Sequence, residues 1–189
     1  MIRSNAARPV LQAVMLGVVL GGPLVAQDTA SAARKQRSGE AQVAAVIEKF
    51  KQKDPGLETR FAEAAGYAVF PTVAKGAIGI GGARGKGYVY EHGKLIGRTT
   101  LTQLSIGLQA GGQAYSEVVF FKTDAALANF KNGRLKLDAQ ASAVALTERV
   151  AQDLKYRDDV AIVTMAQGGL MYEASVGGQK FSFHAIPRP

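Results

Sequence analysis

The spacing of apolar residues along the chain changes from a helical to a strand-like period near Tyr67. Between residues 41 and 53 the apolar residues recur at intervals of three and four, which predicts an amphipathic helix: Val43, Val46, Ile47 and Phe50. A second short helix is predicted at residues 57–65, with Gly66 as its stop signal. From Tyr67 onward apolar residues alternate with polar residues or glycine, which predicts strands.

These alternating segments predict a sheet built from strands that short turns connect. The sequence EHGK is typical of a hairpin turn, with Gly93 at the position that needs a positive φ. Further elements are predicted as strands at residues 104–110, 116–122, 134–138, 160–165, 170–176 and 181–186, and as a helix at 124–130, which Asp124 can cap. Residues 139–159 are ambiguous, strand-like in their first half and helical in their second. The pattern predicts an α+β fold, a β-rich single domain with a mostly antiparallel, glycine-rich sheet and a few short helices, one or two of them at the N-terminal side.

The N-terminal segment has the pattern of a secretory signal. Arg3 and Arg8 precede an apolar run at residues 10–26, which is short for a membrane span. Small residues predict cleavage after Ala26 or Ala32; the alternative is an uncleaved anchor or a core helix. The domain organisation expected is therefore a signal peptide and leader at 1–32, a flexible leader at 33–39 and a folded domain at 40–189. Export to the periplasm or the outer-membrane periphery follows from this interpretation.

Composition narrows the classes of partner. The chain has 23 Lys and Arg against 15 Asp and Glu, a formal net charge of +8, which favours a membrane surface, nucleic acid or another anionic polymer. Nucleic acid is not expected as the partner of an exported protein. The sequence has no cysteine, which excludes disulfides, thiol catalysis and zinc sites built from thiolates.

The glycine-rich segment 76–90, GAIGIGGARGKGYVY, does not fit a nucleotide-binding loop. A P-loop needs a glycine five residues before the glycine of its Gly-Lys pair and a hydroxyl residue after the pair, but around Gly85-Lys86 these positions hold Ile80 and Gly87. No GxGxxG, HExxH or GxSxG motif is present. We therefore assign no catalytic residue, metal ligand or cofactor and expect a protein that is not an enzyme. A hydrolase whose residues converge from distant positions is a weaker alternative.

A cluster of basic residues in and beside this segment is the candidate site. The residues predicted to bind anionic headgroups are Lys75, Arg84, Lys86, Lys94 and Arg98. The residues predicted to lie at the membrane interface are Tyr88, Tyr90, Lys49, Lys51 and Lys53. The alternative is structural: the glycines permit close packing, the cations solubilise the surface, and the helix at 41–53 packs on the sheet.

Several blocks resemble the SYLF domain family. They are GYAVFPTVAKGAIGIGGARGKGYVY, LSIGLQAGGQAYSEVVFF, the LANF helix and GGLMYEASVGG, and together they extend over residues 40–183. The resemblance implies a lipid-binding domain. In eukaryotic members it also implies binding of phosphoinositides and actin, whereas bacterial members are commonly exported. For an exported chain it implies anionic phospholipid or lipid A phosphates as ligands, makes actin an improbable partner, and leaves an envelope protein as the alternative partner. The sequence departs from the family pattern after Asp138.

Overall fold

The structure of the chain is a computed structural model, which describes residues 23–78, 80–106, 111–135, 137, 142–167, 174–175 and 178–186. Two units are described separately, residues 1–36 and residues 37–189. The described part of the first unit is the beginning of helix α1 (Pro23–Lys53). The second unit contains the end of this helix and the whole sheet.

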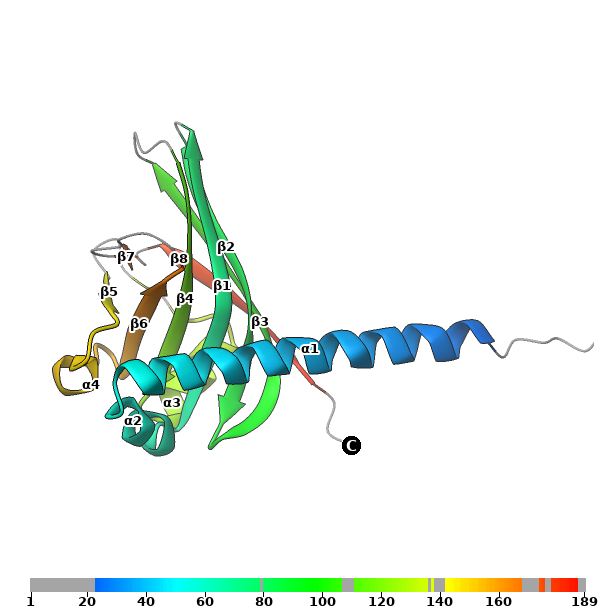
Figure 1. Cartoon of the computed structure of the whole chain (residues 1–189), viewed down its shortest axis with the longest axis horizontal. Helices are drawn as coiled ribbons and strands as arrows, with labels where there is room; N and C mark the ends of the chain where they lie inside the picture. Colours follow the sequence, from blue (N-terminus) through cyan, green and yellow to red (C-terminus); the bar gives the residue numbers. More distant parts are fainter. Residues whose placement is uncertain are drawn as a thin grey trace, which may run out of the picture. The chain divides into compact units, whose positions relative to one another are not determined.

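The described elements that follow α1 form one mixed sheet with helices on its faces. They are α2 (Leu57–Glu63), β1 (Gly66–Ile78), β2 (Ile80–Glu91), β3 (Lys94–Ile106), β4 (Gly111–Phe121), α3 (Asp124–Lys131), β5 (Ser142–Ala145), α4 (Val150–Asp153), β6 (Val160–Ala166), β7 (Ala174–Ser175) and β8 (Gln179–Ala185). The strand order is β7-β5-β6-β4-β1-β2-β3-β8 (Figure 1). Among the described strand pairs only β5 and β6 run parallel. The predicted α+β fold with a mostly antiparallel sheet is therefore confirmed.

Alternating residues of the central strands give the sheet two apolar faces. Phe70 and Phe121 lie on the face that packs against α3, which we call the inner face. Val69 and Phe120 lie on the opposite, outer face, where they pack with α1, α2 and α4. Each face buries a separate core, so the strands at the centre of the sheet are covered on both sides.

The sheet curls, so that its edge strand β8 lies over the inner face of β1. The ring of Phe181 on β8 lies 5.8 Å from that of Phe70 on β1, although β2 and β3 separate these strands in the sheet. Glycines on the inner face of β2 make room for this packing. A Cβ atom at Gly87 would lie 2.5 Å from the carbonyl oxygen of Val69 and 2.7 Å from the Phe70 ring. The glycine-rich sequence of β2 therefore serves close packing at this position.

A buried carboxylate joins the helices of the outer face. Asp54, at the end of α1, accepts hydrogen bonds from the backbone N–H of Gly56 at 2.9 Å and of Ala151 at 2.6 Å. The carbonyl of Ala151 accepts a hydrogen bond from Arg60 Nη2 at 2.8 Å. The backbone N–H and C=O groups of Ala151 in α4 thus bind the end of α1 and a side chain of α2, respectively.

Helix α1 is longer than its apolar pattern predicts. Residues 33–39, for which the sequence predicts a flexible leader, are helical as part of α1. The reason is that alanine, arginine, lysine and glutamine are good helix formers even where no apolar stripe marks the period. The predicted signal segment lies outside the described residues as far as residue 22, and the signal and its cleavage remain predictions.

Other expectations have mixed outcomes. The hairpin turn is confirmed, with φ of 47° at His92 and 75° at Gly93. Helix α3 is capped by Thr123 rather than Asp124, because the Thr123 hydroxyl accepts from the backbone N–H of Ala126 at 3.3 Å. The ambiguous segment 139–159 contains the short strand β5 and the short helix α4.

One predicted strand differs from the described structure, and two others lie partly outside it. Within residues 134–138, the described residues 134, 135 and 137 are not in a strand, and the rest lie outside the described chain. Of residues 170–176, only β7 is described. The predicted strand at 104–110 forms the end of β3 as far as Ile106, and its remaining residues also lie outside the description.

Candidate functional site: a basic face on strands β2, β3 and β8

Strand pairing brings basic residues from distant parts of the sequence to the outer face of the sheet. Arg84 on β2 lies opposite Thr102 on β3, and Thr102 lies opposite Lys180 on β8. Tyr88 lies opposite Arg98, which in turn lies opposite His184. Directly paired residues project from the same side of a sheet. These side chains therefore form neighbouring rows on one surface.

We define the basic face as the exposed basic side chains on these rows: Arg84, Lys86, Arg98, Lys180 and His184. Hydroxyl residues lie between the cations, since Lys86 is opposite Thr100 and Thr100 is opposite Ser182. One row further along the hairpin, Leu104 is 83% exposed and lies opposite Gly82. The face thus combines cations, hydroxyl groups and one exposed apolar side chain.

The described residues of β1, β2, β3 and β8 contain a single acidic residue, Glu91. It lies at the end of β2, and its Oε1 atom is 2.9 Å from Lys131 Nζ, so its charge is paired. The cations of the basic face therefore lie on strands whose described residues include no unpaired acid, so that their potentials add; Glu40 of α1 approaches the neighbouring Tyr90.

The structure brings together three of the five residues predicted to bind headgroups. Arg84, Lys86 and Arg98 belong to the basic face. Lys75 does not, because it lies opposite Ala83, whose side chain is buried in the inner core. Lys94 lies opposite Glu91 at the hairpin end.

Sequence reasoning missed Lys180 and His184. The alternation of these residues with Phe181 and Phe183 predicts that they share one side of a strand. Nothing in the sequence shows that β8 pairs with β3, about 80 residues earlier, because such long-range pairing has no local signal.

The two tyrosines predicted to lie at a membrane interface are half-buried between the sheet and α1. Tyr90 stacks on Tyr67 with 5.0 Å between the ring centroids, and burial, with the neighbouring Tyr67, raises the pKa of Tyr90 to about 12. Tyr88 lies so close to Gly39 on α1 that a Cβ atom there would overlap its hydroxyl. Both rings are packed under the helix rather than exposed on the basic face.

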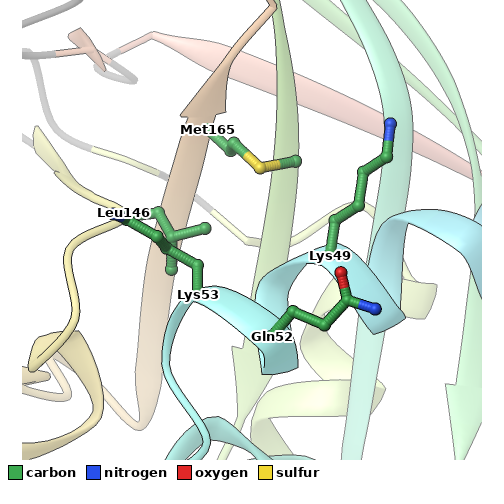
Figure 2. A pocket seen from close by; sticks show the side chains of 5 residues that line it. All are labelled: Lys49, Gln52, Lys53, Leu146 and Met165. Carbon is green, nitrogen blue, oxygen red and sulfur yellow. The ribbon is translucent and has the colours of Figure 1, made fainter.

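The three lysines predicted for the interface lie at the end of α1. Lys49 and Lys53, with Gln52, Leu146 and Met165, line a hollow of about 460 Å³ (Figure 2). Lys51 Nζ lies 3.8 Å from Glu48 Oε1 and 3.7 Å from Glu58 Oε1, and Lys53 Nζ lies 3.5 Å from Glu148 Oε1. These ion pairs are largely exposed, so each contributes little to stability. The lining of the hollow includes no acid, histidine or hydroxyl residue.

Two features, a metal-binding cluster and a membrane-spanning helix, are absent from the described residues. Within them, no group of three or more His, Asp or Glu side chains could hold a metal ion. No helix in the same described ranges is long and apolar enough to cross a membrane.

The basic face can bind phosphate or carboxylate groups by charge-assisted hydrogen bonds.

Comparison with known proteins supports the resemblance seen in the sequence. Residues 102–185 match the family Ysc84, described as Las17-binding protein actin regulator. A relative from Aeromonas veronii, Beta cell expansion factor A, is 28% identical over 139 residues, which cover 72% of this chain and 52% of the relative. The chain thus spans about half the length of this curated relative. The match over residues 102–185, together with this relative, confirms the predicted resemblance to the SYLF domain.

Proposed function

We propose that this chain binds anionic membrane surfaces through the basic face and does so without catalysis. The observation that supports this proposal is the arrangement of exposed cations from three strands on one surface, in strands whose described residues include no acid other than the ion-paired Glu91. A lipid headgroup layer presents phosphates over a plane, and a broad cationic sheet face is complementary to such a plane.

The expected strength of this interaction follows from the number of cations. Each Lys or Arg near an anionic membrane contributes about 1 kcal/mol, so Arg84, Lys86, Arg98 and Lys180 together contribute about 4 kcal/mol. Leu104 can add an apolar contact with the interfacial region, since it is exposed beside Arg84. Because the cations are exposed, salt should screen the interaction.

We place the chain, as part of this proposal, in the periplasm or at the outer-membrane periphery. The N-terminal signal pattern supports export. The ligands proposed there are the phosphates of anionic phospholipids or of lipid A, and neither nucleic acid nor actin is proposed as a partner.

Cosedimentation with lipid vesicles tests the proposal. Residues 33–189, which lack the predicted signal segment, are mixed with zwitterionic or anionic vesicles at low and high salt. We expect binding to the anionic vesicles alone, and release as the salt concentration rises. Equal binding to both kinds of vesicle, or no binding to either, would contradict the proposal.

A protein partner in the cell envelope is the second candidate. The description of the matched family as a Las17-binding protein favours protein binding. A partner that copurifies with the chain regardless of lipid charge would support this alternative.

A further inference from the structure

The interior of the curled sheet contains a cluster of buried polar side chains. Tyr115 and Glu117 on β4, Thr164 on β6 and Gln179 on β8 are each no more than 2% exposed. Glu117 lies directly opposite Thr164, and Gln179 Nε2 donates a hydrogen bond to Glu117 Oε2 at 3.0 Å. Tyr115 is two residues from Glu117 on the same side of β4. Side chains from three strands thus surround one carboxyl group.

Four oxygens of these residues have no hydrogen-bond partner of good geometry in the described structure: Tyr115 Oη, Glu117 Oε1, Thr164 Oγ1 and Gln179 Oε1. The Gln179 side chain lies beside the Tyr115 hydroxyl, which places these two residues together in the cluster. Buried polar atoms are nearly always paired in native proteins, because an unpaired one loses its hydration without compensation. Four such oxygens in one cluster indicate a binding partner for them.

The charge of Glu117 is also uncompensated in the described part of the chain. Its side chain is completely buried, and no Lys or Arg is among the buried residues there. The buried inner-face residues around it from β1, β2, β3 and α3 are apolar or uncharged. Tyr115 is the titratable group beside it on β4, and Lys75, further along the same face on β1, is only partly buried. Burial raises the pKa of Glu117 to about 7, against the opposing effect of its hydrogen bond with Gln179.

We infer that this cluster binds a hard monovalent cation, of the sodium or potassium type, through the oxygens of Tyr115, Glu117, Thr164 and Gln179. One bound cation would pair these oxygens and neutralise the carboxylate at the same time; a protonated Glu117 with ordered water is the alternative from which the test distinguishes it. Ligands that are all oxygen suit hard cations, and a single carboxylate matches a single positive charge.

Thermal unfolding of the full chain tests the inference. The midpoint is measured at about pH 8 in the chloride salts of sodium, potassium and N-methylglucamine at equal ionic strength. N-methylglucamine is too large for a buried site. We expect a midpoint at least about 2 °C higher in sodium or potassium than in N-methylglucamine, rising with the logarithm of the cation concentration.

Two variants separate specific binding from general salt effects. Glu117→Gln should abolish the difference between the salts, and Thr164→Val, which removes one oxygen at similar volume, should reduce it. Glu58→Gln, an exposed carboxylate, should leave it unchanged. Equal midpoints of the unsubstituted protein in all three salts at about pH 8 would overturn the inference, as would an undiminished difference in the Thr164→Val protein.

Discussion

The outer face of the sheet has two halves with different surroundings. Over β1, β4 and β6, outward residues such as Val69, Val118 and Val163 are buried under α1, α2 and α4. Over β2, β3 and β8, α1 covers Tyr88 and Tyr90 in part, and outward residues such as Arg84 and Lys180 are exposed. The strands alternate in the same way in both halves, so the difference lies in the residues at the outward positions and in which strands the helices cover.

This difference separates stability from binding. In the covered half, over β1, β4 and β6, side chains contact the apolar residues of the helices, and their removal should lower the free energy of unfolding. Basic side chains in the other half are exposed, and their removal should leave folding intact while it weakens association with anionic surfaces. The following substitutions test that separation, from the largest expected effect to the smallest.

Truncation of Phe50 should have the largest effect on stability. Its ring, on α1, is completely buried in the outer core, and Phe→Ala substitutions at such positions lower the free energy of unfolding by about 3–5 kcal/mol. Lys86→Gln, in the basic half, should change it by less than about 0.5 kcal/mol. Urea unfolding measures both, and comparable losses in the two proteins would show that the halves do not differ.

Removal of the Asp54 carboxylate should have the next largest effect on stability. Asp54→Ala leaves the buried N–H of Ala151 unpaired and removes the hydrogen bond between the end of α1 and α4. This loss should lower the free energy of unfolding by about 1.5–3 kcal/mol. Glu58→Ala, an exposed carboxylate nearby, is the matched control. If urea unfolding gives equal midpoints for the two variants, the Asp54 contacts do not hold the helices.

Substitution of Gly87 tests what lies beneath the basic half. Gly87→Ala would place a methyl group against the backbone of Val69 and should cost about 1–3 kcal/mol. At Gly76 an added Cβ meets no atom within 4 Å, so Gly76→Ala should be neutral or slightly stabilising. Thermal unfolding compares the two, and equal shifts would mean that the inner-face glycines are not required for packing.

The sequence predicted the parts of this structure that depend on local pattern. The amphipathic stripe containing Phe50 predicted the helix that packs on the sheet, and Gly93 predicted the hairpin turn. The same reasoning stopped short on α1, because its first half carries no apolar stripe. It also gave no reason to expect Thr123, rather than Asp124, as the cap of α3, since both residues are good caps.

The candidate site could be predicted only in part. Arg84, Lys86 and Arg98 are close in sequence and share a hairpin, so their neighbourhood was predictable. The addition of Lys180 and the separation of Lys75 and Lys94 depend on strand register and on pairing over long sequence distances. The buried cluster around Glu117 depends on the curl of the sheet, for which SEVVFFK gives no signal beyond a buried strand.

Vesicle binding of two matched variants tests the central claim most directly. One carries Arg84→Gln, Lys86→Gln and Lys180→Gln; the other loses the same charge at exposed positions outside the basic face, through Lys94→Gln, Lys122→Gln and Lys155→Gln. We expect the first to lose about 3 kcal/mol of binding to anionic vesicles, roughly a 100-fold weaker partition, and the second to lose much less. Equal losses would show that net charge, rather than the basic face, determines membrane binding.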